Sequence, residues 1–264
     1  MLDRPRSERA TQDRLAAFIT LPENQGGLGY RALGDWSGRP NNRCVEADLL
    51  RANLVARGYT KGEIDAAIVR LMQAIEVTGT TLYQANLKTY KLLRYGVDVQ
   101  TSVAAPHKTV HLIDWEKPED NDFALAEEVT LKGGHERRPD LVVYINGLAV
   151  VVIELKRAAV EIGDGIRQLI SNQDEIFNAP FFATAQLLLA GSDAQGLRYG
   201  TVGTPERLFV EWKDEDPPPG ELAPGALLDR PVAQLLRKDR LLDLIRNFVI
   251  FDAGIKKVPR QHPF

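Results

Sequence analysis

Two acids and a lysine stand at the ends of two apolar segments of this 264-residue chain. Asp140 opens the segment DLVVYI, and Glu154 and Lys156 close the segment LAVVVIELK, which follows the turn Asn146-Gly147. An Asn-Gly pair between apolar runs is a strong signal for a β-hairpin, so the two segments are predicted to pair as strands. Charges attached to a buried strand must pair or bind something, because burying an unpartnered charge is costly.

The predicted hairpin would bring these three side chains to one edge of a sheet. Side chains alternate between the two faces of a strand, so Glu154 and Lys156 share one face. Carboxylates are the hard oxygen ligands that Mg²⁺ prefers, and a neighbouring lysine can stabilise a phosphate or orient an attacking water. The pattern predicts a magnesium site at Asp140 and Glu154 with Lys156 beside it. The competing interpretation is an ordinary solvated hairpin end, where an acid and a lysine two residues apart are common.

A perfectly regular hairpin would defeat this arrangement. A strict two-residue turn places Asp140 opposite Ile153, and therefore on the face opposite to Glu154. A three-residue loop or a β-bulge would shift the partner to Val152, which shares a face with Glu154. We therefore expect an irregularity within the hairpin.

Other residues are candidates for the same site. Glu46 shares a stripe with Leu50 and Leu54 in a predicted helix, so it should point toward the core as a candidate third acid. Gln168, in the helix after the hairpin, could contact the site or a phosphate. A set of basic residues around the hairpin could bind nucleic-acid phosphates, although a solvated rim explains each one singly as well: Lys132, Arg137, Arg138, Arg157 and Arg167.

The composition is that of an ordinary globular protein, with 44% hydrophobic and 26% charged residues. Because the formal net charge is -3, any contact with nucleic acid must come from a local basic patch. The one cysteine, Cys44, excludes an internal disulfide and a cysteine zinc site, and it fits a reducing cytosol. The sequence shows no signal peptide and no apolar run of about 18 residues, so we expect a cytoplasmic protein without a membrane span.

The elements that must position the site are visible in the apolar periodicity. Helices are predicted near residues 8–19, 42–57, 61–76, 80–94 and 165–178, with a helical hairpin near 230–249. Strands are predicted near 97–103, 108–115, 122–131, 140–145, 148–156, 183–190 and 207–212, and the Gly-rich residues 20–42 are predicted to be an irregular loop. This order indicates an α/β sandwich. It divides into a domain of residues 1–212, a Pro/Gly/acid linker at 213–226 and a helical segment at 227–264.

The residues Pro139-Asp140 and Glu154-Leu155-Lys156 resemble the PD-(D/E)xK nuclease motif. Longer stretches resemble the N-terminal part of the restriction subunit of type I restriction-modification enzymes. These include LGYRALGDWSGRPNNRCVEADLLRANLVARGY, YQANLKTYKLLRYGV, RRPDLVVYINGLAVVVIELK and QLLLAGSDAQGLRYGTVGTP. The resemblance covers nearly all of the chain. It implies a PD-(D/E)xK nuclease-like core, in which a mixed central sheet is flanked by helices.

The resemblance also implies roles for individual residues. Asp140 and Glu154 would bind Mg²⁺, Lys156 would be the catalytic lysine, and Glu46 would be the helical acid that completes the metal site. Gln168 matches the glutamine of a QxxxY element. The tyrosine position of that element falls on Asn172, which departs from the pattern.

The function that this resemblance implies is Mg²⁺-dependent cleavage of double-stranded DNA delivered by a translocase. The implied partners are the methyltransferase and specificity subunits of a restriction-modification complex. The chain has no G-x-x-x-x-G-K-[ST] loop, so ATP would act only through a motor domain that is not present in this chain.

Two other functions stay open on the sequence. The chain could be a non-catalytic docking module of the complex, which would bind DNA weakly and not cut it. It could also be a stand-alone structure-selective nuclease, which would cut branched DNA and not linear DNA.

Overall fold

The apolar run that ends in the candidate site forms the centre of the fold. β8 (Leu148–Lys156) is buried from its first residue to Leu155, as expected of a strand covered on both faces. It follows β7 (Leu141–Ile145), which is buried along its whole length. The computed structural model describes residues 7–102, 106–174, 178–212 and 226–259.

β8 lies in the middle of a seven-stranded mixed sheet with the order β1-β4-β7-β8-β9-β10-β11. The other strands are β1 (Arg31–Asp35), β4 (Phe123–Glu127), β9 (Leu187–Ser192), β10 (Gly196–Gly200) and β11 (Val210–Glu211). β1 runs parallel to β4 and β8 runs parallel to β9, while the remaining neighbours are antiparallel. This arrangement confirms the predicted mixed central sheet.

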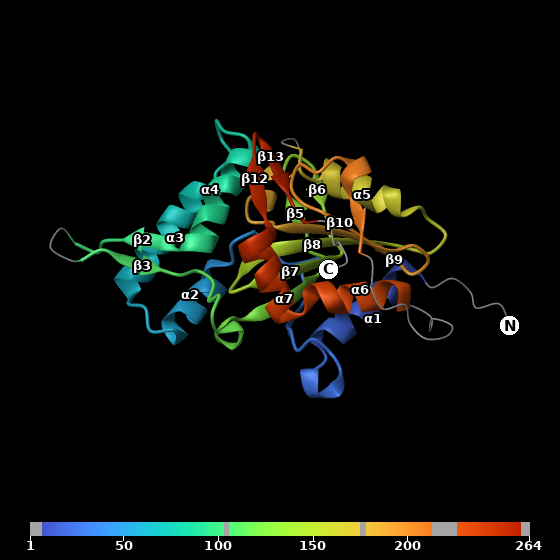
Figure 1. Cartoon of the computed structure of the whole chain (residues 1–264), viewed down its shortest axis with the longest axis horizontal. Helices are drawn as coiled ribbons and strands as arrows, with labels where there is room; N and C mark the ends of the chain where they lie inside the picture. The colour runs from blue at the N-terminus through green and yellow to red at the C-terminus, as the bar shows by residue number, and fades with distance from the viewer. Residues whose placement is uncertain (1–6, 103–105, 175–177, 213–225, 260–264) are drawn as a thin grey trace.

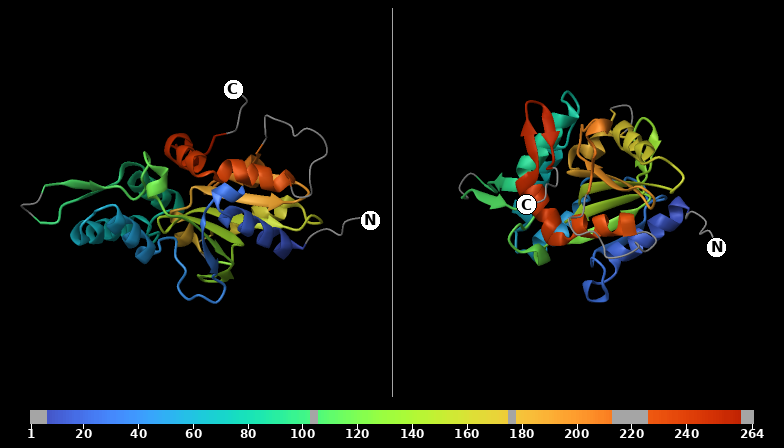
Figure 2. Two further views of the ribbon diagram at one scale, coloured as in Figure 1. Left: turned by 90° about the horizontal axis from the view of Figure 1, so that it is seen from below. Right: turned by 45° about the vertical axis from the view of Figure 1, so that its right-hand side comes forward.

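Helices cover both faces of the sheet. α1 (Glu8–Thr20) and α6 (Ala226–Leu236) lie on one face, and α5 (Ile162–Ser171) lies on the other, as the right-hand view of Figure 2 shows. The side chain of Leu155 points to the α6 face, because an added Cβ at Gly191 would meet both Leu155 and Leu228. Glu154 and Lys156 therefore point to the α5 face. α6 packs on the same sheet as α1, and of the predicted linker only Ala226 lies within the described residues.

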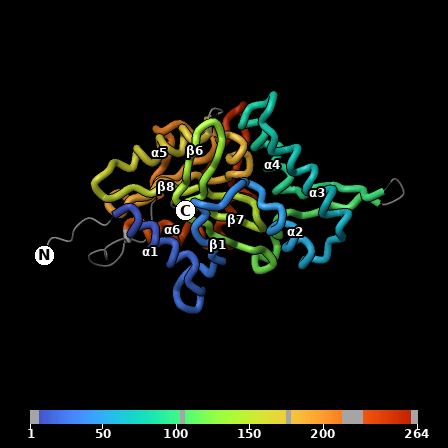
Figure 3. Tube along the Cα trace, turned by 180° about the vertical axis from the view of Figure 1, so that it is seen from behind, coloured from blue at the N-terminus to red at the C-terminus, as the bar shows by residue number. Residues whose placement is uncertain are grey.

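A helical lobe extends from the turn end of the β7–β8 hairpin (Figures 1 and 3). It contains α2 (Ala47–Ala56), α3 (Lys61–Ala74), α4 (Leu82–Tyr95) and the small hairpin of β2 (Val97–Val99) and β3 (Lys108–Val110). α3 and α4 each begin with a capping box, formed by Thr60 with Glu63 and by Thr81 with Gln84. These local signals explain why both helices start where the sequence predicts.

The remaining elements are short. β5 (Leu131–Lys132) and β6 (Glu136–Arg137) form a hairpin between β4 and β7. 3₁₀ turns occur at Glu23–Gln25, Pro118–Asp120, Ala179–Ala183 and Glu206–Leu208. After α6 come α7 (Lys238–Asp243), a π-helical turn at Leu244–Phe248, and the hairpin of β12 (Ile250–Asp252) and β13 (Ile255–Lys257). The sequence predicts a helical segment at 227–264, but the structure forms a β-hairpin after its helices.

A buried lysine connects the C-terminal hairpin by hydrogen bonds to the residues that precede β9. Lys256 is 4% exposed, and its Nζ donates to the carbonyl of Ala185 at 2.9 Å and to Oε1 of Gln186 at 2.8 Å. Burial holds the pKa of Lys256 well below its ordinary value.

None of the helices in the described parts of the chain combines the length and apolar composition that a membrane span requires.

Candidate active site

A β-bulge sets the register of the hairpin that carries the candidate site. Tyr144 pairs with Ala149, but Val143 pairs with Val151, so Val150 has no partner of its own. The extra residue puts Leu141 opposite Ile153, and the next step of the ladder sets Asp140 opposite Glu154. The expected irregularity is confirmed. Its direction differs from the prediction, because the partner of Asp140 is Glu154 itself and not Val152.

Asp140 is a largely buried acid held by backbone groups. Its Oδ2 accepts a hydrogen bond from the amide of Leu155 at 2.6 Å, and its carbonyl accepts one from the amide of Glu128 at 2.8 Å. Burial raises the pKa of Asp140 to about 6, although the Leu155 amide and the charge of Lys156 act in the opposite direction. The side chain therefore changes charge close to neutral pH.

Glu154 is fully buried and only half satisfied. Its Oε1 accepts a hydrogen bond from Nδ2 of Asn172 at 3.3 Å, but its Oε2 has no donor among the described residues. Burial, and then the adjacent charge of Asp140, raise the pKa of Glu154 well above its ordinary value. Two adjacent carboxylates have only acceptor oxygens, so a shared proton or a bound cation must satisfy them. This donor set fits a hard divalent cation.

Lys156 and a residue that the sequence did not single out complete the cluster. Nζ of Lys156 lies 3.7 Å from Oε1 of Glu8, the first residue of α1. The charge of Glu8 also raises the pKa of Asp140 and of Glu154, so this acid lies close to both. The only hint in the sequence is an acid directly after Ser7, the residue that caps α1.

The structure does not bring Glu46, the predicted helical acid, to this cluster. Glu46 occupies the N-cap position of α2, and its amide donates to the carbonyl of Gly147 at 2.8 Å, at the turn end of the hairpin. Six residues of β8 separate this turn from Glu154, which at about 3.3 Å per residue amounts to about 20 Å. Glu46 is buried, and its carboxylate is satisfied there because both oxygens accept hydrogen bonds from Arg39, at 3.0 and 2.6 Å.

The helix α5 and its C-terminal cap residue place polar side chains beside Glu154 and Lys156. An added Cβ at Gly165 would come within 3.3 Å of Cγ of Lys156, so the helix lies close against the lysine. Gln168 is four residues before Asn172 and shares its helical stripe. Asn172, which stands at the tyrosine position of the resembled motif, donates directly to Glu154.

The basic residues predicted for phosphate binding differ in their positions and in their partners. Lys132 and Arg137 lie on the β5–β6 hairpin, which leads directly into Asp140. Arg157 is exposed next to Lys156. Two others are held in ion pairs with acids: Arg138 with Glu128 at 2.8 Å, and Arg167 with Asp164 and Glu206, each at 2.5 Å.

Taken together, the hairpin brings Asp140, Glu154 and Lys156 into one cluster, as predicted. Over the described ranges, no group of three or more acids, histidines and cysteines has a geometry suited to a metal ion. Asp140 and Glu154, with Glu8 near them, are the acids of this cluster that could hold a cation.

We expect the metal-free protein to lose stability as the pH rises from about 4 through about 6. The pKa of Asp140 is about 6 in the folded protein against an ordinary 3.8, so the folded state holds a proton that the unfolded chain releases. The stabilisation from this proton is complete below the ordinary pKa and lost above the folded one, a change of about 3 kcal/mol. Urea unfolding at a series of pH values measures it. Asp140→Asn should flatten the profile over this range, and identical profiles for both proteins would contradict the assignment.

Comparisons with known proteins point to one family. Residues 23–207 match the family model described as the type I restriction enzyme R protein N terminus. The type I restriction enzyme HindI endonuclease subunit of Haemophilus influenzae is 30% identical over 224 residues, which is 80% of this chain and 20% of that protein. The putative type I restriction enzyme MjaIXP endonuclease subunit of Methanocaldococcus jannaschii is 27% identical over 187 residues, covering 62% of this chain and 18% of that protein. The chain thus spans about a fifth of the length of these curated relatives.

Proposed function

Because the chain belongs to the family of type I restriction enzyme R protein N termini, we propose that it is a DNA-cleaving domain that hydrolyses phosphodiester bonds with Mg²⁺. One observation carries the proposal. Glu154 is a fully buried carboxylate with one oxygen that lacks a donor, and it lies against a second buried carboxylate, Asp140. A protein that needed only a stable sheet would not place two acids there, because each one costs stability when ionised.

The residues of the cluster have distinct roles in this proposal. Asp140 and Glu154 hold the cation, and Asn172 orients the Glu154 carboxylate by donating to its Oε1. When bound, Mg²⁺ supplies Lewis-acid stabilisation of the scissile phosphate. The ammonium group of Lys156 stabilises the negative charge that develops on the phosphoryl oxygens as a water attacks phosphorus and the 3′-oxygen leaves. Glu8 positions Lys156 through their ion pair.

The wider assembly follows from the family and is part of the same proposal. The substrate is double-stranded DNA, delivered by an ATP-driven translocase. The methyltransferase and specificity subunits of a restriction-modification complex are the partners. Arg157 is exposed next to Lys156, and Lys132 and Arg137 lie on the β5–β6 hairpin that precedes Asp140; in this proposal they contact the DNA backbone.

The test is nicking of supercoiled plasmid DNA by this chain in Mg²⁺, with EDTA as the negative control. Lys156→Met should lower the nicking rate by about 10² to 10³, the usual cost of removing one preorganised charge-stabilising group. Lys61→Gln is the matched control, since it removes an exposed positive charge on α3, away from the site, and should keep the rate.

Calorimetric titration with Mn²⁺ gives a second readout that does not depend on turnover. The wild-type chain should bind the metal, and Asp140→Asn should weaken that binding. The proposal fails if Lys156→Met nicks DNA at the parental rate, or if the wild type and Asp140→Asn bind Mn²⁺ equally.

A further inference from the structure

α4 has a charge composition unlike that of its neighbouring helix. Its sequence LYQANLKTYKLLRY contains Lys88, Lys91 and Arg94 and no acidic residue. α3 beside it also carries two basic residues, but these are balanced by Glu63 and Asp65. α4 is therefore a local concentration of positive charge on a chain whose net charge is negative.

The two lysines of α4 lie on its outer face. The residues that pack inward are Ala85, Asn86, Thr89, Tyr90 and Leu93. The outward stripe at helical spacing consists of Gln84, Lys88, Lys91 and Tyr95, and Tyr95 is 64% exposed. In the described part of the chain, neither Lys88 nor Lys91 makes an ion pair.

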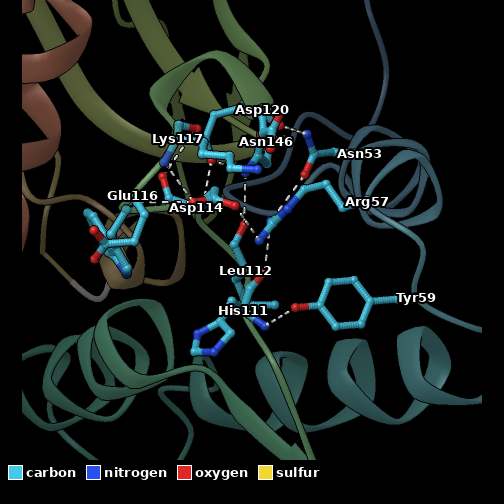
Figure 4. Close-up of polar contacts among 12 residues, drawn as sticks. Asn53, Arg57, Tyr59, His111, Leu112, Asp114, Glu116, Lys117, Asp120 and Asn146 are labelled. Carbon is cyan, nitrogen blue, oxygen red and sulfur yellow. Dashed lines mark hydrogen bonds and ion pairs between the residues drawn. The ribbon is translucent and has the colours of Figure 1, made fainter.

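A cationic pocket continues this face at the C-terminal end of α4. It has a volume of about 540 Å³, and its charged lining consists of Arg57, Arg94, Asp114, Glu116, Lys117 and Arg246. Both acids are already paired: Arg57 reaches Asp114 at 3.5 Å, and Arg246 reaches Glu116 at 2.8 Å. Figure 4 shows Arg57 extending toward Asp114 and the carbonyl of His111. The pocket therefore keeps an excess of positive charge, which Arg94 and Lys117 provide.

We propose that the α4 surface, defined as the outer face of α4 together with this pocket, binds the phosphate backbone of duplex DNA. Phosphate contacts come mainly from lysine and arginine, and tyrosine hydroxyls also make them, so Lys88, Lys91, Arg94 and Tyr95 suit this ligand. The choice of DNA as the polyanion rests on the proposed function.

The α4 surface is remote from the cleavage site. Nδ2 of Asn146 donates to the carbonyl of Leu112 at 2.9 Å, which places the pocket loop at the turn end of the β7–β8 hairpin. Glu154 lies at the other end, about 20 Å further along β8. The phosphates held on the α4 surface would thus be different from the phosphate that is cut.

The experiment compares two double variants of the whole 264-residue chain that lose equal charge. Duplex DNA binding is measured by fluorescence anisotropy over a range of salt concentrations. Lys88→Gln/Lys91→Gln should reduce the slope of log affinity against log salt by about two and weaken binding by about tenfold or more near 0.1 M salt. Lys61→Gln/Arg70→Gln, on the charge-balanced α3, should leave the slope unchanged.

A third variant separates this inference from the proposed function. Glu154→Gln should lose cleavage and keep the wild-type affinity for duplex DNA, because Glu154 is not on the α4 surface. If the wild type binds DNA through α4 and never cuts it, the proposed function fails and the inference stands. An unchanged slope and affinity in Lys88→Gln/Lys91→Gln overturns the inference, as does an equal loss in the α3 variant. Thermal melting of each variant confirms that it is folded.

Discussion

Replacement of Glu154 by glutamine should abolish DNA cleavage and at the same time stabilise the metal-free protein. Cleavage should fall by at least about 10³-fold, because under the proposed function Mg²⁺ would lose one of its two carboxylate ligands. The free energy of unfolding at neutral pH should rise by on the order of 2 kcal/mol, because the wild type must bury a charge or take up a proton at this position. Plasmid nicking and urea unfolding measure the two effects.

Glu46→Gln is the matched control, since Glu46 is also a buried acid next to this hairpin. It should leave cleavage of the folded protein unchanged and lower the free energy of unfolding by about 1–3 kcal/mol, because Arg39 loses an ionised partner. The Glu154 variant should gain stability and the Glu46 variant should lose it. This difference distinguishes an acid that serves to bind a ligand from an acid that stabilises the fold. Loss of cleavage in the Glu46 variant, or loss of stability in the Glu154 variant, would refute this distinction.

Asn146→Ala should cost about 4 kcal/mol of stability, which is a large fraction of what holds a domain of this size folded. Asn146 is fully buried, and its Nδ2 donates to the carbonyl of Leu112 at 2.9 Å and to Oδ1 of Asn121 at 2.8 Å. Its Oδ1 accepts from the amide of Asp122 at 2.7 Å. Each of these hydrogen bonds contributes about 1 kcal/mol to the free energy of unfolding. Alanine is also less favourable than asparagine by about 1 kcal/mol at the left-handed φ of 54°.

Asn41→Ala isolates the backbone part of that loss. Asn41 also has a left-handed φ, of 60°, but its side chain is exposed. We expect this variant to lose only about 1 kcal/mol. Denaturant unfolding of both variants gives the difference, and equal losses would mean that the three hydrogen bonds of Asn146 contribute nothing.

The sequence predicted best those elements whose signals are local. The Asn146-Gly147 turn, the continuous apolar strand after it and the capped helices α3 and α4 all form where predicted. β1 was missed, because it is a short and mostly exposed edge strand inside a Gly-rich segment. Its pairing is parallel to β4, about 90 residues later in the chain, and no local pattern reports such a contact.

The candidate site divides in the same way. Asp140, Glu154 and Lys156 belong to one hairpin, so their proximity could be predicted from spacing and alternation. The helical acid could not, because any of several helices could have packed against the strand end. Glu46 was correctly predicted to be buried, and its carboxylate pairs with Arg39 at the turn end of the hairpin. Glu8 reaches the site only because α1 packs across the sheet, a contact between residues about 150 positions apart.

The bulge at Val150 gives the two arms of the hairpin different lengths. Six residues run from Asp140 to Ile145, whereas seven run from Leu148 to Glu154. Selection for activity would therefore act here on the number of residues in each arm of the hairpin and not on the residue type at position 150. Many apolar side chains could replace valine at position 150 during evolution, but an insertion or deletion in one arm alone would separate the two acids unless the other arm changed with it.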